Sequence, residues 1–245
     1  MHTVTLLGVS IDAVTMPQAI ERLRAFVETA SFHHVMTPNS EMLVEASRNP
    51  AFRSVLQNAS LRIPDSIGLV KMARHTGQHL PERVTGIDTV TAFLSDLPSQ
   101  HGVFLLGSAP GIAEAAAVAL QNKNPGLRVV GIFSGSPREA DAPEILRRIN
   151  AAEPHVLLVA FGSPAQDLWI DRYKQDLHSV RLAMGIGGAF DFLSGKAKRA
   201  PNAFRMLGLE WLWRVMREPT RIKRIWNAVV VFPLLVRRFG RNNPV

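Results

Sequence analysis

Asp65 is the residue of this sequence best placed to remove a proton from a substrate hydroxyl. It follows the short apolar run at residues 61–63 and Pro64, so its carboxylate is predicted to project from the end of a β-strand. A carboxylate in that position can act as a general base. The alternative role is structural, because Asp is a preferred N-cap residue and a helical pattern follows directly. Spacing alone favours the cap.

Arg83 lies in the segment PERVTGID, residues 81–88, just before a Thr-Gly turn. A guanidinium at such a turn can bind phosphate through two parallel hydrogen bonds. The alternative is a salt bridge with Glu82 or Asp88, which are its neighbours along the chain. Taken in isolation, the spacing favours the salt bridge.

Polar or glycine-rich turns follow five of the predicted strands. They lie at residues 37–39, 64–66, 107–111, 162–166 and 185–188. Ligands of open parallel sheets bind beyond the carboxyl ends of the strands, and the helix N-termini that follow favour anions. A nucleotide is therefore the predicted ligand. No turn matches G-x-G-x-x-G or G-x-x-x-x-G-K-[ST], so dinucleotide enzymes and P-loop NTPases lose support.

The elements that must position these residues alternate along the first 195 residues. Strands are predicted at residues 3–9, 34–36, 61–63, 102–106, 127–133, 155–161 and 180–186. Helices are predicted at residues 17–29, 41–46, 51–58, 140–151 and 165–174, with two more ending near residues 73 and 121. Continuously apolar strands that alternate with helices indicate an α/β fold, with a mainly parallel, Rossmann-like sheet and helices on both faces.

A basic, helical appendage is predicted at residues 196–245, after a catalytic domain at residues 1–195. The appendage holds twelve of the 28 Lys and Arg residues, two of the 20 Asp and Glu residues, and three of the four Trp residues. Its pattern predicts helices at residues 204–217 and 220–238, separated by Pro219. Such a segment suits phosphate, either on an anionic membrane or on a diphosphate ligand.

Four arginines of the appendage, Arg214, Arg217, Arg221 and Arg224, are spaced i, i+3, i+7 and i+10. On one continuous helix they would share a face. The alternative is a helix docked on the body with its arginines solvated.

Several classes of protein lose support from composition. The chain has no cysteine, which excludes disulfides and thiolate chemistry. The N-terminus lacks a basic start and a long apolar run, so no signal peptide is expected. The longest apolar stretch, residues 229–236, is interrupted by Pro233 and is shorter than the roughly 20 residues that a spanning helix needs. His75 and His79 are spaced i, i+4, but Gly77 interrupts the helix between them and no carboxylate ligand accompanies them, so no metal site is predicted.

With these segments collected, the chain resembles bacterial glycosyltransferases of the WecG/TagA/CpsF type, glycosyltransferase family 26. The matching segments occur in the family's order and span nearly the whole chain. They are Thr37-Pro38-Asn39-Ser40-Glu41-Met42, Ile63-Pro64-Asp65-Ser66-Ile67-Gly68, Glu82-Arg83-Val84-Thr85-Gly86, Phe161-Gly162-Ser163-Pro164-Ala165-Gln166-Asp167, Met184-Gly185-Ile186-Gly187-Gly188-Ala189-Phe190-Asp191, Arg199-Ala200-Pro201, Leu209-Glu210-Trp211-Leu212-Trp213-Arg214 and Glu218-Pro219.

The resemblance implies an inverting transfer of a hexose from a UDP-sugar to an undecaprenyl-diphosphate-linked sugar, without a metal or other cofactor. The hexose is of the N-acetylmannosamine type or of the glucose or galactose type, and the product enters cell-wall polymer or exopolysaccharide biosynthesis. The implied partners are the donor, the polyprenyl-diphosphate acceptor and, through the appendage, the anionic inner face of the plasma membrane, where a cytoplasmic enzyme would bind peripherally. Nucleic acid is not an expected partner, and a homo-oligomer remains open.

The resemblance also assigns roles to residues. Asp65 falls on the family's proposed general base, Thr37 and Asn39 on polar groups of its pocket, and Arg83 and Gln166 on donor-site positions. Gly187 belongs to the predicted ligand-binding turn at residues 185–188. The appendage arginines, Arg214, Arg217, Arg221 and Arg224, fall on a segment that closes over the site and holds the donor or the lipid diphosphate.

Two positions depart from the family, since Ser66 replaces a common Gly and Asp167 a common Glu. Two other functions stay open at this point. One is a nucleotide-binding oxidoreductase on a Rossmann-like sheet, and the other is a non-catalytic membrane-binding module driven by the appendage.

Overall fold

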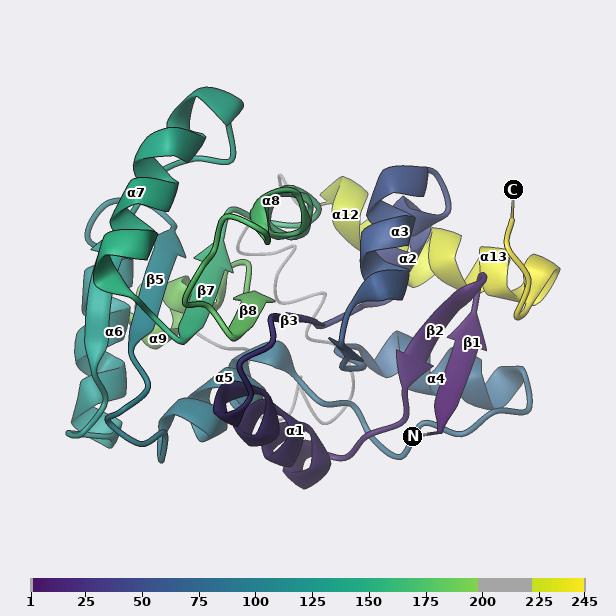
Figure 1. Ribbon diagram of the computed structural model, residues 1–245. Helices are drawn as coiled ribbons and strands as arrows, with labels where there is room; N and C mark the ends of the chain where they lie inside the picture. The colour runs from purple at the N-terminus through teal and green to yellow at the C-terminus, as the bar shows by residue number, and fades with distance from the viewer. Residues whose placement is uncertain (1, 198–221, 245) are drawn as a thin grey trace.

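The computed structural model describes residues 2–197 and 222–244 (Figure 1). At its centre is a six-stranded sheet in the order β4-β3-β8-β7-β5-β6, and every pair of neighbouring strands is parallel. The strands are β3 (His33–Met36), β4 (Leu61–Arg62), β5 (Val103–Gly107), β6 (Val129–Phe133), β7 (Val156–Ala160) and β8 (Leu182–Gly185). The predicted α/β class and parallel sheet are confirmed.

Helices cover both faces of this sheet, as its apolar strands predict. Leu105, Leu158 and Met184 pack on one face, whereas the alternate residues Leu157 and Ala183 pack on the other. The first face carries α1 (Met16–Glu28), α5 (Gly86–Leu94) and α6 (Ile112–Lys123), and the second carries α7 (Ala142–Ala152) and α8 (Ala165–Tyr173). Figure 1 shows α1 and α5 on one side of β7 and β8, with α8 on the other. A sheet buried on both faces needs apolar side chains at every position, which explains the unbroken apolar runs.

The register of the strands brings their carboxyl ends to one edge. Val35 of β3 is opposite Met184 of β8, and Val159 of β7 is opposite Gly185 at the end of β8. Because each strand is only two to five residues long, the loops that follow them begin at nearly the same level. The polar turns of the sequence therefore meet at this edge.

The N-terminal segment differs from the prediction of one strand at residues 3–9. It forms an antiparallel hairpin of β1 (Thr3–Leu6) and β2 (Val9–Asp12), separate from the main sheet. Leu7 and Gly8 make the turn with φ angles of +51° and +75°. Two positive φ angles are typical of the tight turns that match strand twist. Leucine is disfavoured there, but its side chain is fully buried, and this burial offsets the backbone cost.

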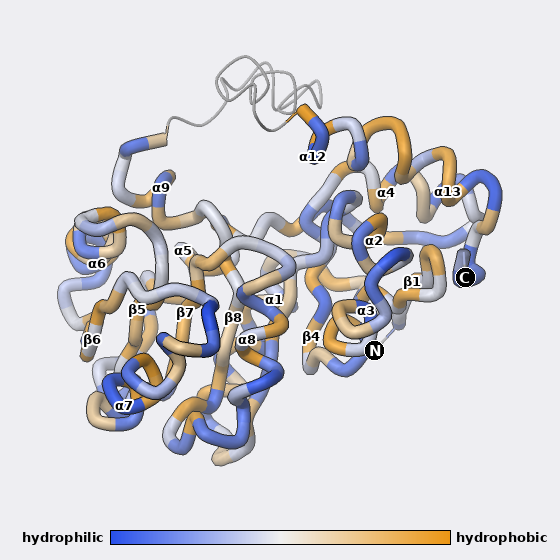
Figure 2. Tube along the Cα trace, turned by 90° about the horizontal axis from the view of Figure 1, so that it is seen from above, coloured by the Kyte–Doolittle hydropathy of each residue, from blue (hydrophilic) through white to orange (hydrophobic). Residues whose placement is uncertain are grey.

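A second hydrophobic core lies beside the sheet and includes the C-terminal helix. It joins the hairpin to α2 (Ser40–Ala46), α3 (Pro50–Asn58), α4 (Ile67–His75) and α13 (Phe232–Phe239). Figure 2 shows α13 beside α2 and α4, at the end of the molecule opposite α6. The backbone N–H of Leu7 donates to Gly240 O, and that of Gly8 donates to Arg241 O. The end of the chain is thus part of the packed body.

The remainder of the predicted appendage is described in part. The helix predicted at residues 220–238 is present as α12 (Ile222–Trp226), a π-helical turn η3 (Asn227–Val231) and α13. The helix predicted at residues 204–217 lies outside the described residues. The domain boundary between residues 195 and 196 stays a prediction. Within residues 2–197 and 222–244, no helix combines the length and the apolar character needed to cross a bilayer.

The burial of Phe232 leads to a stability prediction. Phe232 is 0% exposed, whereas Leu234 of the same helix is 57% exposed. Phe232→Ala should lower the free energy of unfolding by about 3–5 kcal/mol, because a large side chain leaves the second core. Leu234→Ala is the matched control and should change it by less than about 0.5 kcal/mol. Urea unfolding measures both, and equal midpoints for the two variants would contradict the docking of α13.

Candidate functional site

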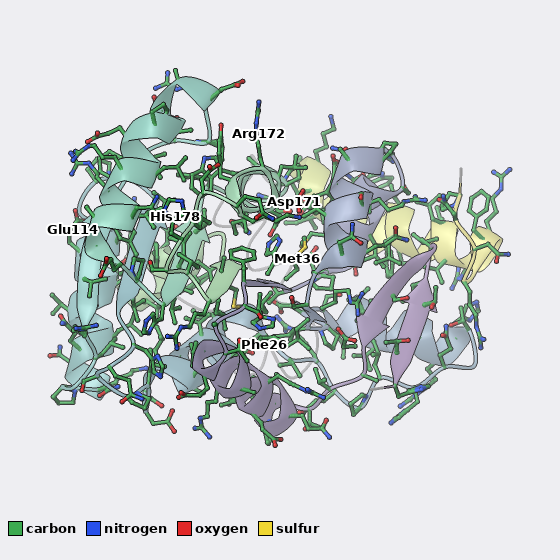
Figure 3. The ribbon with its side chains drawn as sticks, viewed as in Figure 1. Phe26, Met36, Glu114, Asp171, Arg172 and His178 are labelled. Carbon is green, nitrogen blue, oxygen red and sulfur yellow. The ribbon has the colours of Figure 1, made fainter. Side chains whose placement is uncertain are left out.

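A cavity of about 580 Å³ lies at the carboxyl ends of four adjacent strands, β4, β3, β8 and β7. Its wall is built from the loops that follow these strands and from α5, α9 (Ala189–Leu193) and α12. Figure 3 shows Met36, the last residue of β3, near the middle of the molecule, directly before the loop that enters the cavity wall. The predicted site residues that line it are Thr37, Asn39, Asp65, Gln166, Gly187 and Arg224. A cavity at this edge is where an open parallel sheet is expected to bind its ligand.

Asp65 is held in the cavity wall by its neighbours on both sides. Its backbone N–H donates to Pro38 O, and the carbonyl of Pro64 accepts from the N–H of Val84. Its Oδ2 accepts a hydrogen bond from the N–H of Gly86 at 3.0 Å. The side chain remains 24% exposed, so the carboxylate can reach a ligand in the cavity.

The N-cap role that spacing favours for Asp65 is wrong. The N-cap of α4 is Ser66, whose Oγ accepts from the N–H of Leu69 at 3.2 Å. Ser66 has an extended backbone with φ −158°, so this position does not require the glycine that is common in the family. The serine therefore takes the capping role and leaves the aspartate to the cavity.

Arg83 reaches Asp65 rather than its chain neighbours. Its Nε lies 3.6 Å from Oδ1 of Asp65, and both side chains are half-buried. The predicted alternative partners have other contacts, because Glu82 Oε1 accepts from the N–H of Met16 and Asp88 pairs with Thr85. Arg83 is not among the residues that line the cavity. Its geometry is that of a group that orients the carboxylate, and its predicted contact with a donor stays a prediction.

Thr37 and Asp65 meet around Gly86, and Asn39 lines the same cavity. The side chain of Asn39 caps α2, since its Oδ1 accepts from the N–H of Met42 at 3.0 Å. A Cβ on Gly86 would lie 3.2 Å from the methyl of Thr37 and 3.5 Å from Oδ2 of Asp65. The missing side chain of Gly86 thus lets the side chains of Thr37 and Asp65 approach the same backbone segment.

Gln166 ties two glycine loops together at the other end of the cavity. The side chain is 4% exposed, and its Oε1 accepts from the N–H of Gly162 at 3.1 Å and from that of Gly187 at 3.0 Å. Gly185 leaves room for it, because a Cβ there would lie 2.5 Å from Nε2 of Gln166. Part of the role of Gln166 is therefore to hold the backbone of the predicted anion-binding turns.

The structure also shows a charged cavity residue, Lys196, that sequence reasoning missed. Lys196 lines the wall, 4.0 Å from the carboxylate of Asp191. Its position at the start of the basic segment was the available signal. Arg224 brings a second positive charge from α12 and donates from Nε to Glu41 Oε1 at 2.6 Å. Arg214, Arg217 and Arg221 lie outside the described residues, so their shared face with Arg224 stays a prediction.

The histidines lie away from this arrangement. His33 stacks on Phe26, with ring centroids 4.0 Å apart, and burial lowers its pKa. His34 points to the opposite face of β3, where its Nε2 is 3.7 Å from Oδ1 of the buried Asp167. In the two described ranges, no three His, Asp or Glu side chains come close enough together to hold a metal ion.

Comparison with known proteins gives a family and a set of relatives. Residues 4–244 match the model of the glycosyl transferase WecG/TagA/CpsF family. A Bacillus spizizenii protein is 33% identical over 192 residues, which cover 78% of this chain and 74% of the relative. A Staphylococcus aureus protein is 31% identical over 241 residues, 97% of this chain and 93% of the relative. Both are named N-acetylglucosaminyldiphosphoundecaprenol N-acetyl-β-D-mannosaminyltransferase.

The two hydrogen bonds to Gln166 lead to a prediction. Gln166→Met keeps the size of the side chain but leaves two backbone donors without their acceptor, so the free energy of unfolding should fall by about 1–3 kcal/mol. Amide hydrogen exchange at Gly162 and Gly187 should speed up at the same time. The exposed Gln175, which has no such role, supplies the control variant Gln175→Met. If amide exchange at Gly162 and Gly187 were as slow in Gln166→Met as in the wild type, the proposed role of Gln166 in holding the two loops would be wrong.

Proposed function

We propose that this chain, which belongs to the glycosyl transferase WecG/TagA/CpsF family, moves an N-acetylmannosaminyl group from a UDP donor to an undecaprenyl-diphosphate-linked N-acetylglucosamine. The chain is a glycosyltransferase of the hexosyltransferase class, because the family model covers residues 4–244. The named activity of relatives that span 97% of this chain supports the sugar and the acceptor. The oxidoreductase and the non-catalytic module are both wrong, since this family consists of transferases.

The observation that carries the proposal is the Asp65 carboxylate in the cavity wall. Among the described residues that line the cavity, it is the sole carboxylate. A double displacement with retention needs a carboxylate nucleophile on the protein. A direct inverting displacement on a sugar nucleotide needs a base for the acceptor hydroxyl but no protein acid, because the diphosphate is already a good leaving group. A single anchored carboxylate therefore supports the inverting route.

The proposed step follows from this arrangement. Asp65 takes the proton from the acceptor hydroxyl, and the hydroxyl oxygen forms a bond to the anomeric carbon from the face opposite the leaving group. The bond between that carbon and the diphosphate oxygen breaks, and UDP leaves with the electron pair. Lys196 and Arg224 lie in the same wall and would stabilise the charge that develops on the diphosphate.

The C-terminal helices support a peripheral position on the inner face of the plasma membrane. Ile222, Trp226, Val229 and Leu234 are exposed apolar side chains on α12, η3 and α13. Lys223, Arg237 and Arg238 alternate with them along the chain. Apolar side chains beside cations bind anionic lipid surfaces, and a lipid-linked acceptor would be presented there.

A panel of donors tests the proposed sugar. The full-length enzyme is incubated with a short-chain lipid diphosphate that carries N-acetylglucosamine and with one of four donors. These are UDP-N-acetylmannosamine, its uronic acid, UDP-glucose and UDP-galactose. Product should form only from UDP-N-acetylmannosamine, because the similar transferases are named for that sugar. Product from any of the other three donors instead would refute the assigned donor.

Asp65→Asn tests the base. The amide has the shape of the carboxylate but cannot accept the proton, so transfer should fall by about 100- to 10,000-fold while the UDP dissociation constant stays within about threefold. Asp171→Asn is the control, because Asp171 does not line the cavity and its carboxylate pairs with Lys174. Wild-type turnover by Asp65→Asn would rule out the assignment.

A further inference from the structure

The contact between Glu41 and Arg224 joins two parts of the chain that are 183 residues apart. Arg224 Nε donates to Glu41 Oε1 at 2.6 Å. Arg224 lines the cavity, whereas Glu41 does not. The carboxylate is therefore outside the cavity lining, bonded to a guanidinium that is part of it.

The backbone of Glu41 is held in place by the packing of helix α2. It is the second residue of α2, whose first turn is capped by Asn39 through the N–H of Met42. Its neighbours Ser40, Met42 and Leu43 are buried, and α2 packs against η3. A carboxylate in the first turn is also favoured by the helix dipole. This helix can hold a partner in place.

Arg224 keeps most of its donors available. A guanidinium has five N–H groups in a rigid plane, and Glu41 occupies the one on Nε. Within the part of the chain that the structure describes, no hydrogen bond engages Nη1 or Nη2 of Arg224. A guanidinium bound at one edge can present the other edge to two phosphate oxygens at once.

The Glu41–Arg224 ion pair is expected to matter for ligand binding more than for folding stability. The two side chains are 46% and 28% exposed, and an ion pair at such a surface adds little to the free energy of folding. A free arginine loses rotamer freedom when it binds a ligand, and holding it in the bound geometry removes that cost. The effect of Glu41 is therefore expected in ligand binding and hardly at all in stability.

We propose that Glu41 is a positioning residue, which holds the guanidinium of Arg224 at the cavity wall so that its terminal nitrogens bind a diphosphate. The inference rests on the proposed function, because that function supplies the class of ligand. The diphosphate belongs either to the sugar nucleotide or to the lipid acceptor.

The test is a double-mutant cycle in the full-length chain, with Glu41→Ala, Arg224→Ala and the double variant. Calorimetry measures the dissociation constants of UDP and of a short-chain lipid diphosphate, and a thermal scan gives Tm. Glu41→Ala should weaken one of the two ligands about tenfold, since hydrogen bonds to charged groups depend steeply on geometry. Glu41→Gln keeps an acceptor and should lose about threefold. The double variant should bind no more weakly than Arg224→Ala alone.

Two controls test whether the effect comes from the loss of any surface glutamate or from a loss of folding stability. Glu114 is an exposed glutamate in the first turn of α6, on the outer flank of the molecule (Figure 3). Glu114→Ala should leave both dissociation constants unchanged. Tm of Glu41→Ala should stay within about 4 °C of wild type, because a surface ion pair contributes little to stability.

The binding measurements show which diphosphate Arg224 binds and whether Glu41 positions it. A weaker UDP complex identifies the donor diphosphate as the ligand of Arg224, and a weaker lipid complex identifies the acceptor. Losses that multiply in the double variant, or unchanged binding of both ligands to Glu41→Ala, would overturn the positioning role. Both measurements are of binding, so a wild-type enzyme that uses a different donor sugar would refute the proposed function and leave this inference standing.

Discussion

Parallel pairing of β4, β3, β8 and β7 is the constraint on which the site depends. These strands are only two to five residues long, and their register brings four loops to one edge. Each loop contributes a different group, namely polar side chains after β3, the carboxylate after β4, and glycine backbone after β7 and β8. Chemistry that needs a base and anion-binding donors together is thus assembled from segments that are far apart in sequence.

Around that edge, Asp65, the two glycine turns and Arg224 are each held in place by a different neighbouring group. Asp65 is braced by Gly86 and Arg83, and Gln166 holds the two glycine turns. Arg224 is braced by Glu41 from outside the cavity. Supports of this kind keep the groups in place before a ligand arrives, which reduces the reorganisation that binding and reaction require. The family's shared activity is consistent with such a preorganised edge.

The sequence predicts the sheet and the location of the site well, because both follow from local patterns. Continuous apolar runs such as residues 155–161 mark buried parallel strands, and polar turns at their ends mark the ligand edge. Local patterns do not decide which of two adjacent residues takes a role that both can fill. Asp65 and Ser66 are both good N-caps, and only the three-dimensional path shows that Ser66 takes this role. The Leu7-Gly8 turn lacks the Asn-Gly signal of hairpins, and the Glu41–Arg224 contact leaves no mark in either local segment.

Pairing of the hairpin with residues 240 and 241 has a consequence for biosynthesis. Leu7 and Gly8 are bonded to Gly240 and Arg241, and Phe232 fills the core on which α2 rests. The ribosome must therefore release the chain as far as Arg241 before α2, with Asn39 and Glu41, finds its final packing. A nascent chain that lacks this segment has no finished cavity.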